Sequence, residues 1–260
     1  LHQNKELWKN DVMIFEYDTS LKLMHLERNI KTTPKVVFIR QAEYPEMERK
    51  IWAEAENEKQ QEMMELDQQF LEIAEDNLKN SNVSTIFLLG DGFKEGWAKE
   101  SLKLLCKNRR VFQGNNLYSK GACYGMLERM NPSAEWKENV YLGVDKLKSN
   151  IGIRVLRQGK ESYYAILDAG VNWYEAESEF DVILESGNEL KFVITPLTGG
   201  NVTNRVVILE GLPERPARTT RLNVHIEMTA VDQAAITVED MGFGELFPSS
   251  GKAWTHNISV

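Results

Sequence analysis

The spacing of hydrophobic and polar positions changes near Pro132, and this change predicts two domains, residues 1–132 and 133–260. Before Pro132, three short apolar segments separated by turn residues predict strands at Asp11 to Tyr17, Leu21 to Glu27 and Lys35 to Arg40. The first two strands form a hairpin across a short polar turn. The first domain is therefore expected to begin as an antiparallel sheet.

A long helix is expected next, beginning after Pro45, because proline is tolerated in the first turn of a helix. Its apolar positions step by three and four residues, which predicts one buried stripe. The members of that stripe are Met63, Leu66, Phe70 and Ile73. Residues 54–62 are polar nearly all round, so the segment 41–80 is expected to project as a helical arm.

The segment Thr85 to Leu89 is apolar on both faces, which is typical of a central strand in an α/β sheet. It ends in a turn with two glycines, Gly90 and Gly92, where a backbone without side chains allows close approach. A helix from about Gly96, a short strand at Val111 and Phe112, and a helix rich in small residues from Ser119 follow.

Beyond Pro132 the pattern is one of many short strands separated by turn residues, which predicts a β-sandwich. In Leu222 to Met228 the apolar side chains occupy every second position, as in a strand with one buried face. The eight expected strands are Gly152 to Arg157, Ser162 to Leu167, Phe180 to Glu185, Glu189 to Thr195, Arg205 to Leu209, Arg221 to Thr229, Ala234 to Glu239 and Ala253 to Ser259.

The composition of the chain excludes several classes of site and partner. Two cysteines in 260 residues do not make a disulfide framework, and the four histidines lack the spacing of a zinc site, so no metal is expected. No catalytic constellation is visible. No apolar segment approaches the roughly 20 residues of a membrane span. An acidic chain without aromatic residues interleaved in a basic stripe also argues against nucleic-acid binding.

The net charge of −8 is unevenly distributed. Residues 41–80 carry twelve acids and four bases, whereas residues 81–132 carry four acids and eight bases. The basic residues near the glycine turn would attract a phosphate-bearing ligand, but a solvated helix face explains them as well. Both interpretations remain open at this stage.

Two regions resemble the seventy-kilodalton heat-shock chaperones. The first joins the strand and turn Ile86 to Lys94 with the small-residue helix from Gly121, and is similar to the family's adenosine motif and the helix that closes its ATPase domain. The second runs from Leu209 to Pro213, through Leu222 to Met228, and on to Val231 to Asp240, and resembles the loops and strands of the chaperone β-sandwich.

The resemblance implies a multidomain α+β fold: the second lobe of an actin-like (ribonuclease H-like) ATPase followed by an all-β sandwich. It implies one wall of an adenine-nucleotide cleft, made by Gly90, Asp91, Gly92, Phe93 and Lys94. The full-length protein is then expected to use ATP or ADP with magnesium, while this chain needs no cofactor. The implied source is an atypical bacterial heat-shock-like protein of the cytoplasm.

Departures from the family pattern limit these implications. Asp91 separates two glycines that are adjacent in the family, and Lys94 stands where the family has an arginine that stacks on adenine. The segment Asn131 to Trp136 stands where the family has a leucine-rich linker, and these 260 residues contain no counterpart of the family's helical lid. Neither phosphate-binding loop is present, so no residue receives a catalytic role and this chain alone is not expected to hydrolyse ATP.

Two functions from different classes follow. In one, the full-length protein is a nucleotide-responsive module and possesses ATPase activity, with a sandwich that binds peptide or protein. In the other, the first domain is a degenerate scaffold without ATPase activity, and the sandwich binds a protein partner through loops carrying Trp173, Tyr174 and Phe243. In the first case, Gly90→Val is expected to leave the fold largely intact and to abolish nucleotide binding.

Overall fold

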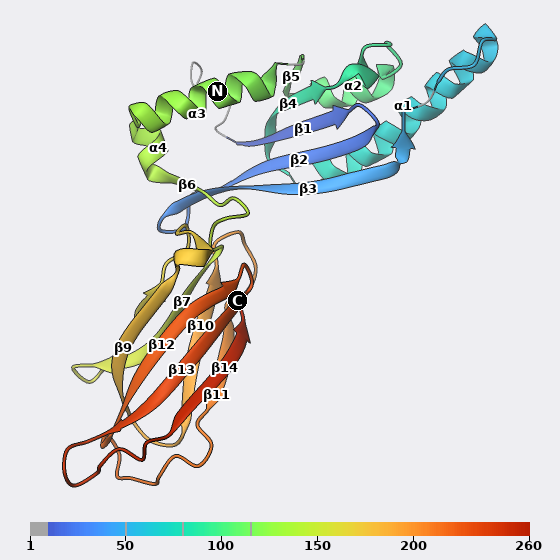
Figure 1. Ribbon diagram of the computed structural model, residues 1–260. Coiled ribbons are helices and arrows are strands. Elements are labelled where there is room, and N and C mark those ends of the chain that lie inside the picture. The colour runs from blue at the N-terminus through green and yellow to red at the C-terminus, as the bar shows by residue number, and fades with distance from the viewer. Residues whose placement is uncertain (1–9, 50, 80, 115) are drawn as a thin grey trace. The chain divides into compact units, whose positions relative to one another are not determined.

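The structure is a computed structural model that describes residues 10–49, 51–79, 81–114 and 116–260 (Figure 1). The chain divides into two compact units, Leu1–Val140 and Tyr141–Val260. The change of domain expected from the sequence lay at Pro132, within the first of these units. Each unit has its own hydrophobic core.

The first unit is built on a six-stranded sheet with the order β5-β4-β1-β2-β3-β6. β1, β2 and β3 are antiparallel, whereas β4 runs parallel to β1 and β5 runs parallel to β4. The strands are β1 (Asp11–Tyr17), β2 (Ser20–Asn29), β3 (Lys35–Glu48), β4 (Val83–Leu89), β5 (Arg110–Gln113) and β6 (Asn139–Tyr141). All five strands expected in this part of the sequence, from Asp11 to Phe112, are confirmed.

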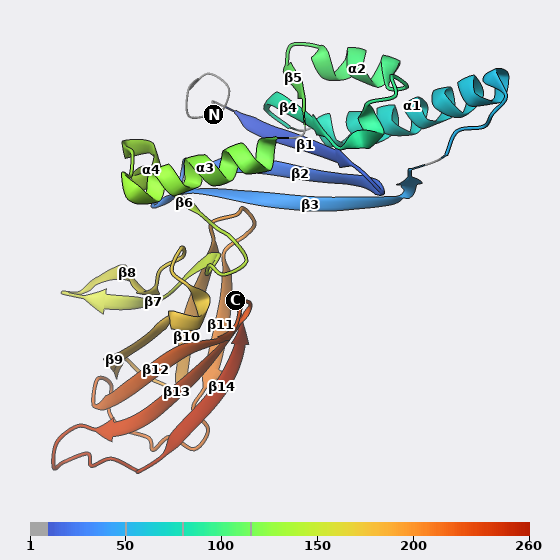
Figure 2. The same cartoon turned by 45° about the horizontal axis from the view of Figure 1, so that its top comes forward.

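Helices lie on both faces of this sheet (Figure 2). They are α1 (Glu56–Leu78), α2 (Lys99–Cys106), α3 (Leu117–Met130) and α4 (Ala134–Glu138), with a short 3₁₀ helix, η2 (Asp91–Phe93). The stripe expected on α1 is confirmed in part, because Leu66 and Phe70 are buried in the core with Phe15. On the opposite face, the Tyr118 hydroxyl of α3 donates a hydrogen bond to Glu16.

The helix expected to begin after Pro45 starts instead at Glu56, so that prediction is wrong. β3 continues through Pro45 to Glu48. Its pairing with β2 jumps from Leu21 opposite Tyr44 to Ser20 opposite Glu48, so Pro45 lies in an irregularity of the ladder. A proline has no N–H to donate, and such an irregularity is one of the few places where a strand tolerates it.

Aromatic rings fill the core between α1, η2 and the sheet. Phe15 meets Phe70 edge to face at 5.1 Å, and Phe93 stacks on Trp97 at 5.8 Å with 18° between the ring planes. Tyr17 contacts both Phe93 and Trp97. Offset and edge-to-face pairs add to the hydrophobic burial of large rings, so this cluster stabilises the junction between β4 and α2.

Asp67 of α1 explains where α2 begins. Its carboxylate accepts hydrogen bonds from the backbone N–H groups of Lys99, Glu100 and Ser101, at 2.9, 2.7 and 3.0 Å. The first N–H groups of a helix have no partner within the helix, and a carboxylate also complements the positive end of the helix dipole. A buried aspartate on one helix therefore serves as the cap of the next.

The second unit contains two four-stranded antiparallel sheets, β11-β10-β7-β8 and β14-β13-β12-β9, around one core (Figure 1). The strands are β7 (Ser149–Arg157), β8 (Lys160–Leu167), β9 (Glu177–Leu184), β10 (Glu189–Pro196), β11 (Thr203–Ile208), β12 (Thr220–Ala230), β13 (Gln233–Gly242) and β14 (Ala253–Ser259). Each of the eight expected strands overlaps one of these. In β12, Leu222, Val224 and Ile226 face the core as the alternating pattern predicted.

The fold class expected from the chaperone resemblance is contradicted. Of the described residues, strands hold 47% and helices 23%, in three sheets with few helices, and no actin-like α/β lobe is evident among them. An all-β sandwich is compatible with the second unit. The error arose because a parallel strand, a glycine turn and a helix are local features that do not specify the architecture around them.

Within the described residues, none of the helices combines the length and the apolar character that crossing a membrane requires.

Candidate functional site

The expected nucleotide-binding turn joins β4 to η2. Gly90 has φ = 96°, in the region that favours glycine. A Cβ atom at Gly90 would lie 2.8 Å from Asp18 Oδ1, and one at Gly92 would lie 2.5 Å from Tyr17 Cδ1. The β1–β2 turn of the same chain thus fills the space that the absent side chains leave.

The charged residues of this turn have partners within the chain. Asp91 Oδ1 lies 2.6 Å from Lys94 Nζ, and the Asp91 N–H donates to Asp18 Oδ1 at 3.0 Å. Phe93 is buried in the aromatic core, and the Gly92 carbonyl accepts a 2.7 Å hydrogen bond from Trp97 Nε1. The structure brings the five predicted residues together, but their contacts are those of a tight turn. Nucleotide binding there remains a prediction.

The basic residues expected around the turn do not all gather there. Arg109 and Arg110 line an open pocket of about 360 Å³ with Ser84, Cys106 and Asn108. Ser84 is near the start of β4, whereas Gly90 follows its end. These two arginines therefore lie at the opposite end of the strand from the glycine turn.

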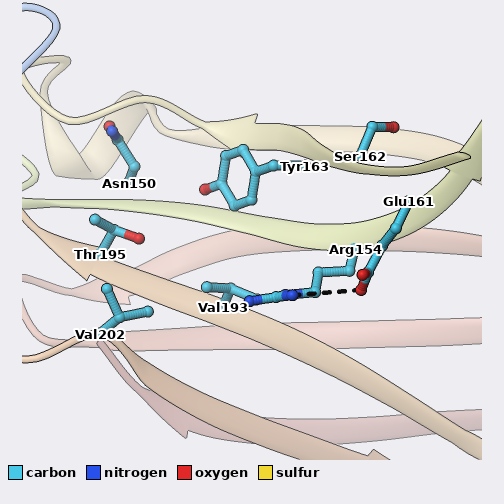
Figure 3. A pocket seen from close by; sticks show the side chains of 8 residues that line it. All are labelled: Asn150, Arg154, Glu161, Ser162, Tyr163, Val193, Thr195 and Val202. Atoms are coloured by element: carbon cyan, nitrogen blue, oxygen red, sulfur yellow. Dashed lines mark hydrogen bonds and ion pairs between the residues drawn. The ribbon is translucent and has the colours of Figure 1, made fainter.

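A larger pocket, of about 470 Å³, lies on the outer face of sheet β11-β10-β7-β8 (Figure 3). Residues of three strands and one loop line it: Asn150, Arg154, Glu161, Ser162, Tyr163, Val193, Thr195 and Val202. The core-facing residues of β7 and β10, such as Ile153 and Phe192, alternate with them and point to the sandwich interior. Strand alternation therefore positions the lining residues of β7 and β10.

Gly152 is the reason that Tyr163 can lie flat against the sheet. A Cβ atom at Gly152 would be 2.5 Å from the Tyr163 hydroxyl oxygen, so a larger residue would displace the ring. Tyr163 is nevertheless 47% exposed. Its partial burial, and secondarily the negative charge of Asp168, raise the pKa of its hydroxyl. The ring therefore offers an apolar surface beside an uncharged hydrogen-bonding group.

Polar side chains border the ring. Arg154 Nη1 donates to Glu161 Oε1 at 3.3 Å across the β7–β8 pair (Figure 3). Asn150 Oδ1 accepts a 2.7 Å hydrogen bond from the backbone of Ala169, which orients that amide. Val193 and Val202 supply apolar surface. The arrangement can bind a ligand by stacking, apolar contact and hydrogen bonding, and it contains no nucleophile with an adjacent base among the described lining residues.

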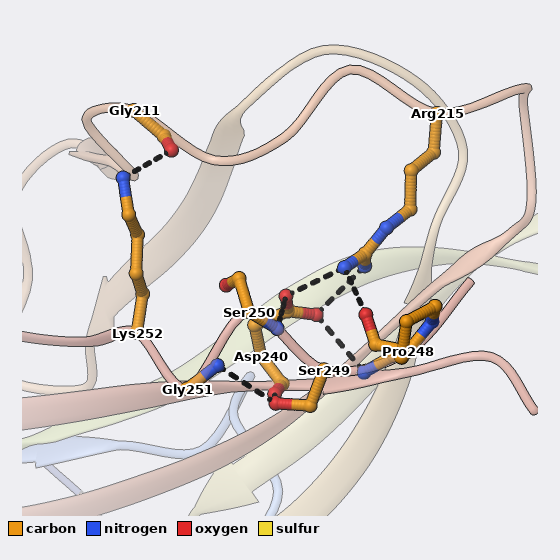
Figure 4. Close-up of polar contacts among 9 residues, drawn as sticks. Gly211, Arg215, Asp240, Pro248, Ser249, Ser250, Gly251 and Lys252 are labelled. Carbon is orange, nitrogen blue, oxygen red and sulfur yellow. Dashed lines mark hydrogen bonds and ion pairs between the residues drawn. The ribbon is translucent and has the colours of Figure 1, made fainter.

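A second structured feature connects the loop after β11 with the end of β13 and the loop that follows it (Figure 4). Arg215 makes two 2.8 Å hydrogen bonds to the two carboxylate oxygens of Asp240, and a third of the same length to the Pro248 carbonyl. The Asp240 side chain is 0% exposed and that of Arg215 is 5% exposed. We call this pair and its partners the Arg215–Asp240 clasp.

Asp240 is held in its charged form. Burial alone raises its pKa, but hydrogen bonds from Arg215, Ser250 and the Gly242 N–H outweigh that effect and keep the pKa far below its usual range. The clasp fixes the loop that carries Phe243 and Leu246, which are 44% and 87% exposed. Both residues are thereby presented to solvent from an anchored loop.

The other loop aromatics expected to bind a partner differ from each other. Trp173 packs partly against the sandwich core, whereas Tyr174 is 58% exposed. The two rings meet edge to face at 5.6 Å. Trp173 thus serves packing, and Tyr174 adds to the exposed aromatic surface.

Two family models match the chain. Residues 1–144 match the C-terminal model of a family of unknown function, DUF5716. The chain belongs to the DUF5716 family. Residues 146–260 match a domain of unknown function, DUF8552. No match was found among curated proteins.

In this DUF5716 protein, the glycine turn lies in the part that the DUF5716 model covers. The pocket around Tyr163 and the Arg215–Asp240 clasp lie in the DUF8552 part. The division between the two matches falls within a few residues of the division between Val140 and Tyr141. Neither description assigns a chemistry, so the function has to be argued from the sites.

The residues lining the Tyr163 pocket were not among those expected to be functional. Gly152 offered a signal, because a glycine inside a strand pattern indicates a close approach by another group. The identity of the approaching group depends on the pairing register of β7 and β8, which the sequence does not give. In that register Tyr163 lies opposite Arg154, two residues after Gly152. The clasp gave no signal, since Arg215 and Asp240 lie in different parts of the sequence.

Proposed function

We propose that the second unit is a binding module that holds an extended segment of another protein on the outer face of sheet β11-β10-β7-β8. The pocket around Tyr163 is the observation that carries this proposal. Peptide or protein binding by the sandwich is also the role expected from the chaperone resemblance. An enzymatic role for this unit is not part of the proposal.

The shape of the pocket supports a macromolecular ligand. Sites for small molecules are clefts or cavities that bury most of the ligand surface. The Tyr163 pocket is shallow and open, so most of a small molecule placed there would remain in water. A side chain of a longer segment suits it better, because the rest of the segment can contact the surrounding sheet.

The position of Tyr163 supports an extended conformation of that segment. Tyr163 belongs to β8, which is the last strand of its sheet. An extended segment that pairs with such an edge gains main-chain hydrogen bonds and presents alternate side chains to one face. Its side chains on the outer face would then lie beside Tyr163, and Arg154 lies one strand further into the sheet.

The residue types that line the Tyr163 pocket are suited to binding a peptide segment tightly. Tyrosine and arginine are enriched among the residues that dominate binding energy, because each combines a large contact surface with hydrogen bonding. Tyr163 already lies against Gly152, so little side-chain freedom is lost on binding. Val193 and Val202 complete an apolar floor.

A selection from a random peptide library displayed on phage, with the full chain as target, tests the proposal. Enriched peptides are synthesised and titrated by calorimetry against the wild type, Tyr163→Ala, Arg154→Ala and the matched control Thr237→Ala. Thr237 faces outward on the other sheet, beside Thr255. The two pocket variants are expected to weaken binding by about tenfold or more, and the control to leave it unchanged.

Equal binding by all four proteins would refute the assigned face, as would a selection that enriches nothing. Loss of binding in Leu246→Ser with full binding in Tyr163→Ala would assign the ligand to the anchored loop instead. Circular dichroism of each variant separates loss of the pocket from loss of the fold.

A further inference from the structure

The outer face of the other sheet carries a concentrated set of metal-ligating side chains. Glu177 of β9 and His225 and Glu227 of β12 each offer one ligand atom, and these atoms all lie within 4.8 Å of one another. β9 and β12 are neighbours in the sheet (Figure 1). The cluster lies on the opposite sheet from the Tyr163 pocket and is independent of it.

Strand geometry explains the convergence. His225 and Glu227 are two residues apart on one strand, so their side chains emerge on the same face. Glu177 lies directly opposite Glu227 in the antiparallel register, and Glu179 lies directly opposite His225. Residues opposite each other have Cβ atoms about 5 Å apart, so the ligand atoms meet without any rearrangement of the backbone.

The register also places Glu177 and Glu227 opposite each other, and a cation would relieve the repulsion between these two carboxylates. Two carboxylates at directly opposite positions destabilise a strand pair. Asn223 donates to Glu179 and Asp181, at 3.1 and 3.0 Å, and so engages the next two carboxylates along β9. Beside the opposed pair Glu177 and Glu227, His225 Nε2 lies 4.0 Å from a carboxylate oxygen of Glu227.

We infer that Glu177, His225 and Glu227 form a binding site for a divalent transition-metal ion of the Zn²⁺ type. Zinc binds imidazole nitrogen at about 2.0 Å and carboxylate oxygen at about 2.1 Å, so tetrahedral ligand atoms lie roughly 3.4 Å apart. Small side-chain rotations close the observed spacing to this value. Three protein ligands leave a fourth position for water or for a side chain of another molecule.

The ligand set distinguishes between cations. Ca²⁺ and Mg²⁺ prefer shells made of oxygen, whereas an imidazole ligand favours zinc and its neighbours in the first transition series. The side chains of His225 and Glu227 are 38% and 53% exposed, so an ion can reach them directly from solvent. Metal binding would replace the repulsion between the two opposed glutamates with a bridge.

Calorimetric titration of the full chain with Zn²⁺ tests the inference. Cys106 and Cys123 are exposed thiols that would also bind zinc, so both are first replaced by serine. In this background, Zn²⁺ is expected to bind at the cluster, and His225→Ala and Glu177→Gln are each expected to weaken that binding by about tenfold or more, about 1.4 kcal/mol. Excess Ca²⁺ is expected not to compete.

Two variants serve as matched controls. Glu239→Gln removes a carboxylate of the neighbouring strand β13, and His256→Ala removes a histidine of β14; neither residue belongs to the cluster. Both are expected to bind Zn²⁺ as the parent does. Titration with Co²⁺ adds a spectroscopic readout, because intense ligand-field bands in the visible region report four-coordinate binding by the protein and should weaken strongly in His225→Ala.

An affinity for Zn²⁺ that is the same in the parent, His225→Ala and Glu177→Gln would show adventitious binding only and would overturn the inference. The absence of saturable Zn²⁺ binding in the parent would overturn it as well. His225→Ala and Glu177→Gln replace exposed or half-exposed side chains, so neither variant is expected to unfold, and circular dichroism checks this.

Discussion

At the scale of single residues, several glycines of this chain lie where another group comes close to the backbone, but the glycine alone does not identify that group. Gly90 and Gly92 were expected to make room for a nucleotide, and the structure places Tyr17 and Asp18 against them. Gly152 makes room for the Tyr163 ring in the same way. A sequence pattern cannot tell a ligand from another part of the same chain, because both require an absent side chain.

Gly90→Ala is expected to destabilise the first unit by about 1–3 kcal/mol, because the residue combines φ = 96° with a backbone carbonyl in the path of the new side chain. The same geometry argues against the expectation that Gly90→Val leaves the fold largely intact. Urea unfolding of the first unit measures the effect. Gly121→Ala is the control, since no neighbour lies within 4 Å of its Cβ position and α3 gains helix propensity. Equal stability of Gly90→Ala and wild type would contradict this account.

At the scale of elements, the strands were more predictable than the helices. All eight strands of the sandwich follow from alternation and turn residues, which depend on neighbours a few positions away. The start of α1 was misplaced because Pro45 suits both a first helical turn and an irregular strand, and only the pairing of β3 with β2 decides between them. The candidate metal cluster has no zinc-site spacing in the sequence, because its third ligand, Glu177, comes from a different strand.

The Arg215–Asp240 clasp and the Arg218–Glu185 pair provide a matched comparison within one loop. Both are bidentate, but the side chains of the second pair are 69% and 52% exposed. Arg215→Ala leaves a buried carboxylate without its main partner and is expected to cost about 3 kcal/mol of sandwich stability. Arg218→Ala is expected to leave the urea midpoint almost unchanged, since solvent screens an exposed pair. A larger shift for Arg218→Ala than for Arg215→Ala would invalidate the role given to burial.

The lowered pKa of Asp240 also predicts how the stability of the sandwich depends on pH. Its folded pKa is depressed, so its stabilising contribution is complete above the unfolded value of about 3.9 and is lost as the pH falls through that value toward the folded pKa. The free energy of unfolding is therefore expected to decrease between about pH 5 and pH 2. Asp240→Asn should show a shallower decrease over the same interval, measured by urea titrations at each pH. Parallel pH profiles for the two proteins would rule out this residue as the cause.

At the scale of the whole molecule, the chain consists of two structural units that do not share a hydrophobic core. One core joins residues of β1, β2, β4, α1 and α2, and the other joins residues from Leu147 to Ile258. Among the described residues, none belongs to both clusters. The division into a DUF5716 part and a DUF8552 part follows the same line. Stability of one unit is therefore expected to be set by its own sequence.

Separate cores predict separable unfolding. A fragment of residues 141–260 is expected to fold alone and to reproduce the sandwich transition of the full chain, because its eight strands and its core lie entirely within it. In scanning calorimetry, Arg215→Ala should lower only that transition, and Gly90→Ala only the other. Single-site effects that stay within one unit are the signature of independent cooperative units, whereas a shared shift would mean that the two units unfold as one. If the fragment is unfolded at room temperature, residues outside it contribute to its stability, and the pocket and the metal cluster must then be studied in the intact chain.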